Sequence, residues 1–236
     1  MRIRASVLSA VLVALASGHA FAAAPQTVTM RTEDGVTLFG SFFAPGKPGP
    51  GVILLHMQTR SREDWNALGS RLADSGFAAL AIDLRGHGAS DPPPAGAQDP
   101  ARMQLDVKAA RGWLAARADV RPGSIGIVGA SIGANLAILY AAGDPSVRSL
   151  ALLSAGLDYR GLKTEAAMGR IGKRAALLVA SDGDAYAASS ARKLSQVEGG
   201  TRELQMLGGS GHGTAMLTRQ PELIAALVDW FRRTLL

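Results

Sequence analysis

The stretch SIGIVGASIGANLAILYA, residues Ser124 to Ala141, places an apolar run, a glycine-flanked serine and a helical pattern in direct succession. The run Ile125 to Val128 is typical of a buried strand, and the apolar residues that follow recur at helical spacing. A serine on a strand-to-helix turn has a strained backbone, and flanking glycines let neighbouring segments approach it. The segment Gly129-Ala130-Ser131-Ile132-Gly133 therefore predicts Ser131 as an exposed nucleophile. The alternative is a glycine-rich connection that carries an incidental serine; a G-x-G-x-x-G dinucleotide pattern is not matched.

The first residues have the pattern of an export signal. Two arginines precede an apolar run, Ala5 to Ala16, and Ala20-Phe21-Ala22 matches a small-x-small cleavage site. The run is too short to anchor the chain across a bilayer. We therefore expect a signal peptide over residues 1–22, with cleavage after Ala22 or Ala24, and a mature bacterial protein without a membrane span that is periplasmic or secreted.

The remaining residues, 23–236, are enough for one well-buried core, and we expect a single domain. The sequence contains no cysteine, which excludes disulfides and a thiol nucleophile. The formal net charge is +6, but the arginines are scattered and aromatic residues make up only 5% of the chain. A nucleic-acid-binding protein would need a clustered basic surface with interleaved aromatics, so we expect no nucleic-acid partner.

Strand and helix patterns alternate along the chain. A hairpin is expected from Val28–Met30 and Val36–Phe43 around Glu33-Asp34-Gly35. Further strands are expected at Val52–His56, Phe77–Asp83, Ile125–Val128, Leu150–Ser154, Ala175–Ala180 and Glu203–Leu207. Helices are expected at Ser61–Ser75, with Ser61 and Asp64 as its cap, Ala101–Ala116, Ala134–Tyr140, Ala185–Val197 and Pro221–Leu236, and a surface loop at Leu84–Pro100. This alternation predicts an α/β fold with a mostly parallel central sheet flanked by helices on both faces.

A serine nucleophile needs a histidine base and a carboxylate that orients it. Of the four histidines, His19 lies in the expected signal, His56 and His87 precede the serine, and only His212 follows it. His212 lies in the glycine-rich loop Gly208–Gly213, beyond a predicted strand, where catalytic groups gather in parallel sheets. We therefore predict His212 as the general base; the alternative is an exposed histidine in a flexible connector.

The carboxylate has three candidates. Asp182 and Asp184 directly follow a predicted strand, within reach of a histidine on the next strand's loop. Asp184, at the start of the following helix, is preferred and Asp182 is the second choice, whereas Asp158 is a more distant third. Aspartate also favours helix N-termini for structural reasons, so Asp184 as a simple cap is the alternative reading.

The chain resembles the α/β-hydrolase superfamily, because the order Ser131, Asp184, His212 matches that family's nucleophile, acid and base. The resemblance covers essentially the whole mature chain. It extends to Leu55-His56-Met57-Gln58 after the third strand and to Asp83-Leu84-Arg85-Gly86-His87-Gly88 after the fourth. It implies an α/β-hydrolase fold, with His87 in a structural role.

The resemblance also implies an oxyanion hole. Its donors would be the backbone N–H of Ile132, directly after the nucleophile, and a second N–H, most naturally from Gln58. Met57 stands where the family usually has a glycine, and Met57 itself is the alternative second donor.

Only about Ala155 to Arg174 separates the strand after the nucleophile's helix from the next one. That leaves room for a helix or two and no large lid domain, as in the compact dienelactone-hydrolase-like branch of the superfamily. We therefore expect a small-molecule ester as the substrate and a Ser-His-Asp carboxylesterase as the enzyme. The alternatives are an amide, peptide or thioester hydrolase with the same triad, or a non-catalytic binding protein on this scaffold. No metal-binding motif occurs, and acyl transfer needs no organic cofactor, so none is expected.

Overall fold

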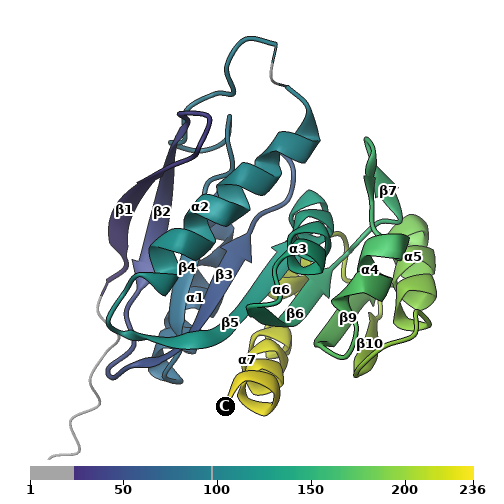
Figure 1. Cartoon of the computed structure of the whole chain (residues 1–236). Coiled ribbons are helices and arrows are strands. Elements are labelled where there is room, and N and C mark those ends of the chain that lie inside the picture. Colours follow the sequence, from purple (N-terminus) through teal and green to yellow (C-terminus); the bar gives the residue numbers. More distant parts are fainter. Residues whose placement is uncertain (1–23, 97) are drawn as a thin grey trace, which may run out of the picture.

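The protein is described from a computed structural model, which covers residues 24–96 and 98–236. The expected signal peptide, residues 1–22, lies outside these described residues. Figure 1 shows a twisted sheet between two layers of helices.

The central sheet has eight strands in the order β1-β2-β4-β3-β5-β6-β9-β10. The strands are β1 (Gln26–Arg31), β2 (Thr37–Phe43), β3 (Gly49–Leu55), β4 (Ala78–Ile82), β5 (Val120–Ala130), β6 (Val147–Leu153), β9 (Ala175–Ser181) and β10 (Arg202–Leu207). Strand β2 pairs antiparallel with β1 and β4, and every pair from β4 to β10 is parallel. The expected hairpin and the mostly parallel sheet are confirmed.

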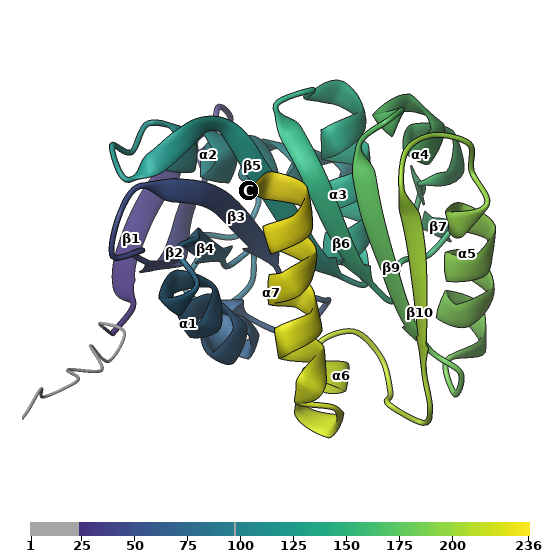
Figure 2. The same cartoon turned by 90° about the horizontal axis from the view of Figure 1, so that it is seen from below.

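The helices cover both faces of the sheet. They are α1 (Asn66–Asp74), α2 (Gln104–Ala115), α3 (Ile132–Gly143), α4 (Glu165–Ile171), α5 (Ala185–Ser195), α6 (Ala215–Arg219) and α7 (Glu222–Leu235), with short 3₁₀ helices at Arg62–Trp65 and Pro100–Met103. Helices α2, α3, α4 and α5 contribute to the core on one face, and α1 and α7 to the core on the other. Figure 2 shows α1 and α7 together on the second face.

The pattern of strand β3 explains how both cores form. Ile53 and Leu55 pack into the core beneath α2 and α3, whereas Val52 and Leu54 pack into the core beneath α1 and α7. All four side chains are fully buried. A strand whose successive side chains point to opposite faces must be apolar throughout when helices cover both faces.

Three details differ from the sequence-based expectations. The short helix α6 was not predicted, because its five residues follow a glycine-rich loop. The segment Leu84–Pro100 is not wholly a surface loop: Arg85 is buried, since its guanidinium is paired with Asp34 at 2.8 Å and Asp106 at 2.7 Å. Ser61 does cap a helix start, by accepting from the Glu63 N–H, but the Asp64 carboxylate bonds elsewhere.

The connection between β6 and β9 is short. It holds a small hairpin, β7 (Asp158–Tyr159) and β8 (Leu162–Lys163), and helix α4. The expected absence of a large lid at this place is therefore a feature of the fold.

Two kinds of feature are absent from the described residues, a membrane-spanning helix and a cluster of potential metal ligands. No helix among them is long and apolar enough to cross a membrane. Nor do three or more histidine or acidic side chains within residues 24–96 and 98–236 come together as a potential metal site.

Candidate active site

Ser131 lies on the turn between β5 and α3 with a backbone φ of 53° and ψ of −117°. Positive φ is rare for a residue with a side chain, and such strain concentrates at functional sites. The turn is held by the Ser131 N–H, which donates to the Leu153 carbonyl at 2.8 Å, and by the Ser131 carbonyl, which accepts from the N–H of Ala134 at 2.9 Å. The serine side chain is half-buried.

Both glycines that flank Ser131 are sterically required. A Cβ on Gly129 would lie 2.2 Å from the Gly133 carbonyl oxygen, inside the turn itself. A Cβ on Gly133 would lie 2.4 Å from the carbonyl oxygen of Leu55 and 2.7 Å from that of His56. The first glycine therefore closes the turn, and the second lets helix α3 approach the end of β3.

His212 lies in the loop between β10 and α6, and its ring contacts Asp184. The ring Nδ1 is 2.5 Å from Asp184 Oδ2, while Asp184 Oδ1 accepts from the Ala187 N–H and caps α5. Because Asp184 accepts a hydrogen bond from the Nδ1–H group, Nε2 is the nitrogen left to accept a proton in the neutral ring. The His212 side chain is 47% exposed, so a substrate can reach this nitrogen.

The other two candidate acids have different partners. Asp182 Oδ1 accepts from the Gly209 N–H at 2.7 Å, and so holds the backbone of the His212 loop. Asp158 lies in the β7 strand and accepts from the Gly161 N–H at 2.8 Å. Of the three aspartates, only Asp184 is hydrogen-bonded to the His212 ring within the described residues.

Two serines that the sequence did not identify as site residues hold the His212 loop: Ser154 ends one expected strand, and Ser181 directly follows another. Ser181 Oγ accepts from the Ser210 N–H at 2.8 Å, and Ser154 Oγ accepts from the Gly213 N–H at 2.9 Å. A polar residue at the carboxyl end of each predicted strand is the signal that could have identified them.

The same contacts bring the histidine loop beside the nucleophile turn. Ser154 follows Leu153, whose carbonyl accepts the Ser131 N–H, and a Cβ on Gly213 would lie 3.5 Å from the Ala130 Cβ. The residues before Ser131 and after His212 are therefore neighbours in space.

The expected oxyanion donors come from the start of α3 and from the turn that follows β3. Ile132 begins α3, and the first N–H groups of a helix have no intrahelical acceptor. Met57 and Gln58 begin a turn in which the Arg60 N–H donates to the Met57 carbonyl at 3.2 Å. The Met57 sulfur would lie 2.6 Å from a Cβ on Gly213, so this turn packs against the histidine loop. Met57 and Gln58 are both half-buried here, and both stay candidates for the second donor.

His56 links the Met57–Arg60 turn to the segment after β4. Its Nδ1 donates to the Met57 carbonyl at 2.8 Å, and its Nε2 accepts from the Leu84 N–H at 3.0 Å. Burial lowers the pKa of His56 to about 4, so the ring is neutral and both nitrogens are engaged. His87 lies nearby and donates through Nδ1 to the Arg85 carbonyl at 3.0 Å. Within the described residues, neither ring is hydrogen-bonded to Ser131 or to a carboxylate.

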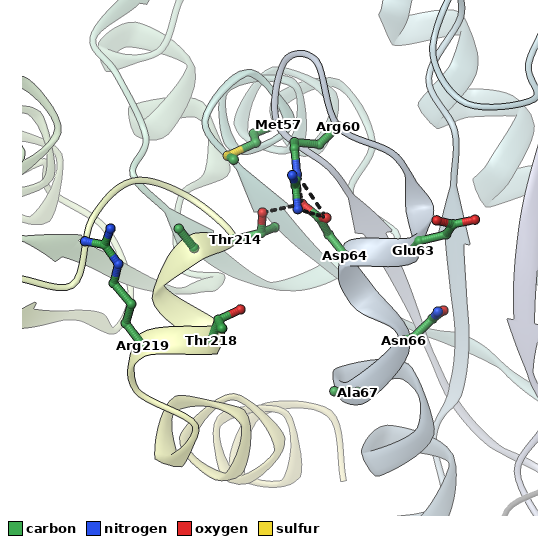
Figure 3. Close-up of a pocket in the computed structure, with 10 residues that line it drawn as sticks. Met57, Arg60, Glu63, Asp64, Asn66, Ala67, Thr214, Thr218 and Arg219 are labelled. Carbon is green, nitrogen blue, oxygen red and sulfur yellow. Dashed lines mark hydrogen bonds and ion pairs between the residues drawn. The ribbon is translucent and has the colours of Figure 1, made fainter.

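A cleft of about 570 Å³ opens beside the Met57 turn and the start of α6, as Figure 3 shows. Its lining is Met57, Arg60, Glu63, Asp64, Asn66, Ala67, Thr214, Ala215, Thr218 and Arg219. Arg60 and Asp64 form an ion pair at 2.6 Å, and the Thr214 hydroxyl donates to the same carboxylate. The cleft therefore combines an ion pair and a hydroxyl with apolar surface from Met57, Ala67 and Ala215, and it lies directly beyond the His212 loop.

Comparison with known proteins agrees with this geometry at the level of the family. Residues 46–228 match the model of the hydrolase family described as serine aminopeptidase, S33. An uncharacterized protein of Mycobacterium tuberculosis is 31% identical over 124 residues, which are 52% of this chain and 43% of the relative. The chain thus spans less than half the length of that relative.

Solved structures resemble the fold over almost its whole length. An esterase of Pyrococcus furiosus gives a TM-score of 0.71 at 19% identity, covering 89% of this chain and 93% of its own. The dienelactone hydrolase of Anabaena variabilis also gives a TM-score of 0.71, at 20% identity, covering 91% of this chain and 100% of its own. At these identities the likeness shows the α/β-hydrolase fold.

Proposed function

The chain belongs to the α/β-hydrolase family described as serine aminopeptidase, S33, and on that premise we propose that it hydrolyses carboxylic esters through an acyl-enzyme at Ser131. One observation carries this proposal: a serine at positive φ on a strand-to-helix turn, beside the loop whose histidine is paired with Asp184. A nucleophile, a base and an orienting acid are the groups that acyl transfer requires.

In this proposal the Ser131 Oγ attacks the ester carbonyl while His212 Nε2 takes its proton. Asp184 holds the Nδ1–H tautomer and stabilises the imidazolium that forms. The oxyanion is bound by the Ile132 N–H and by the N–H of Gln58 or Met57, each donor lowering the barrier by about 3 kcal/mol. His212 then protonates the departing alcohol, and a water that His212 deprotonates hydrolyses the acyl-enzyme.

The ion pair and the hydroxyl in the cleft favour a small ester as the substrate. An alkyl chain laid along Arg60, Asp64 and Thr214 would desolvate an ion pair and a hydroxyl without replacing their contacts with water. A short acyl or alcohol group avoids that cost.

The experiment that tests the nucleophile is Ser131→Ala, assayed with p-nitrophenyl acetate and with a fluorophosphonate probe. We expect kcat to fall by roughly a thousandfold or more and the covalent adduct to disappear, while the melting temperature is retained. Ser195→Ala, at the exposed end of α5, is the matched control and keeps both activity and labelling. Parental turnover by Ser131→Ala would remove the nucleophile assignment. A natively folded protein without any adduct would instead indicate a binding protein.

Peptide hydrolysis is the second candidate, because the matching family is described as a serine aminopeptidase. The same triad serves amide and ester bonds, so fold does not decide between them. Aminoacyl p-nitroanilides, compared with the corresponding p-nitrophenyl esters, separate the two: we expect kcat/KM to be higher for the esters.

We further propose that the protein is exported and that residues 1–22 are removed. Support comes from the charged start, the apolar run and the Ala20-Phe21-Ala22 site. Expression of the full sequence in a bacterium, followed by fractionation and intact-mass measurement, tests this. A mass that corresponds to a start at residue 23 or 25 in the periplasm or medium is expected, and an uncleaved cytoplasmic chain contradicts the proposal.

A further inference from the structure

The Asp64 carboxylate receives hydrogen bonds from two segments that are far apart in the sequence. Arg60 donates through Nε to both carboxylate oxygens, at 3.0 and 2.9 Å, and through its terminal nitrogen at 2.6 Å. The Thr214 hydroxyl donates to Asp64 Oδ2 from a position 150 residues further along the chain. Figure 3 shows the three side chains meeting in the lining of the cleft.

Each donor belongs to a different part of the candidate site. Arg60 closes the turn that begins with Met57 and Gln58, the two candidates for the second oxyanion donor. Thr214 lies two residues after His212, and the Ala215 N–H donates to the His212 carbonyl at 3.2 Å. Asp64 is thus joined directly to the Met57–Arg60 turn (the oxyanion turn) and to the loop between β10 and α6 that carries His212 (the histidine loop).

Arg219 and Gln220, at the end of α6, also bond the histidine loop, and four further side chains hold it from the opposite direction. These four are Ser181, the last residue of β9, and Ser154, Asp182 and Asp184, which lie just after β6 and β9. All accept hydrogen bonds from the loop's backbone or from the His212 ring. These contacts fix the histidine loop relative to strands β6 and β9, on one side of β5. The Asp64 contact fixes it relative to the turn after β3, on the other side of Ser131.

The link is built from a charged, largely buried acceptor. The Asp64 side chain is 9% exposed. Burial by itself would raise its pKa, but hydrogen bonds from Arg60 and Thr214 and the Arg60 charge outweigh burial, so the pKa of Asp64 lies below its usual value. Asp64 is therefore ionised at neutral pH, and hydrogen bonds to an ionised acceptor are shorter and stronger than neutral ones.

We infer that Asp64 is a positioning residue. Through Thr214 and Arg60 it fixes the positions of the histidine loop and the oxyanion turn relative to each other, on the two sides of Ser131. The inference rests on the proposed function. The reacting atoms need alignment to a fraction of an ångström, and a misplacement of about 1 Å can cost about a hundredfold in rate. Loss of the link should thus lower the rate of the chemical step more than it weakens substrate binding.

Thr214→Val is the first test, because it keeps the shape of the buried side chain and removes only the hydroxyl. We expect kcat for p-nitrophenyl acetate to fall about tenfold while KM changes less than twofold, and Thr214→Ser to restore most of kcat. The acid limb of the kcat/KM profile should move to lower pH, since a loosened loop lets Asp184 stabilise the imidazolium less well. The control is Thr234→Val in α7, which removes a comparable hydroxyl contact, with Ser149, outside the site.

Asp64→Asn and the double variant complete the test. Asp64→Asn retains the volume and one acceptor oxygen but not the charge, and it should lower kcat on its own. If both positions act through one link, adding Thr214→Val to Asp64→Asn should lower kcat less than twofold further.

The inference is overturned if Thr214→Val matches Thr234→Val in melting temperature, kcat and acid limb, or if the two single effects multiply. Either outcome leaves the Ser131 assignment intact. Failure of the proposed function is seen separately, as retained turnover in Ser131→Ala.

Discussion

Ser131 adopts a backbone conformation that a side chain disfavours, at a cost on the order of 1–3 kcal/mol. Several contacts with the surrounding chain hold Ser131 in this conformation. The Ser131 N–H is bonded to Leu153 in β6, and glycines on both sides leave room for backbone carbonyls of the turn and of β3. The strain is therefore offset by packing at positions that do not themselves take part in chemistry.

Gly133→Ala should destabilise the protein strongly. The new Cβ would meet carbonyl oxygens of Leu55 and His56 at 2.4 and 2.7 Å, and backbone cannot move away as a flexible side chain would. Overpacking of this kind costs about 1–3 kcal/mol, so the melting temperature should fall by several degrees, together with activity. Gly143→Ala, the same change at the exposed end of the same helix, meets nothing within 4 Å and should be neutral or stabilising. Equal melting temperatures would contradict this explanation.

His56 makes folding stability depend on pH. Its pKa is lowered from 6.5 to about 4 chiefly by burial; the Met57 carbonyl raises it, His87 lowers it, and Asp83 and Asp64 raise it. The unfolded chain binds a proton below about 6.5, whereas the folded chain resists it until about 4, so stability falls as the pH falls through this window.

Between pH 7 and pH 5 the His56 contribution to the free energy of unfolding should decrease by about 2 kcal/mol. Urea unfolding at the two pH values measures the change. His56→Gln, whose amide can serve the same two partners without titrating, should lose much of this pH dependence. An unchanged pH dependence in the variant would show that other groups are responsible.

At the scale of elements, the site is assembled from the carboxyl ends of parallel strands. Strand β5 delivers Ser131, the loop after β9 delivers Asp184, and the loop after β10 delivers His212. Because neighbouring strands lie about 4.8 Å apart, groups on adjacent loops come within hydrogen-bonding distance while their sequence positions remain distant. The glycine-rich histidine loop is flexible by composition, and side chains at the strand ends hold it in place.

The two aspartates after β9 should differ sharply in their effect on catalysis. Asp184→Asn removes the charge that stabilises the His212 imidazolium and should lower kcat by about a hundredfold to ten-thousandfold. Asparagine is a good helix cap, so the start of α5 is retained and folding should change little. Asp182→Asn alters a backbone contact of the same loop and should lower kcat less than tenfold. Rate measurements under saturating p-nitrophenyl acetate compare them, and the reverse order would assign the acid to Asp182.

At the scale of the whole molecule, the short β6–β9 connection leaves the site without a large lid, and the neighbouring cleft contains an ion pair and a hydroxyl. Across p-nitrophenyl acetate, butyrate, octanoate and laurate we expect kcat/KM to be highest for the two short esters and about tenfold or more lower for laurate. The Ser131→Ala variant supplies the background rate for each ester. A maximum at laurate would contradict the assignment of the cleft to short acyl or alcohol groups.

Much of this architecture could be predicted from local patterns. The hairpin, the buried strands and the main helices lie within a few residues of their expected positions, because periodicity is a property of neighbouring residues. The buried Arg85 and the short helix α6 could not be predicted in this way. Arg85 is buried only because Asp34 and Asp106 reach it from other elements, and α6 is stabilised by packing rather than by its own length.

The sequence by itself determined the α/β-hydrolase fold, the serine turn and the single downstream histidine, since these follow from spacing and chain order. Only the tertiary structure decided that Asp184 reaches the His212 ring while Asp182 bonds the loop backbone, because two residues of separation decide which way a side chain points. It also brought Asp64 to Thr214, across 150 positions. No local pattern encodes such a contact: it arises from where the packed sheet places the ends of its strands.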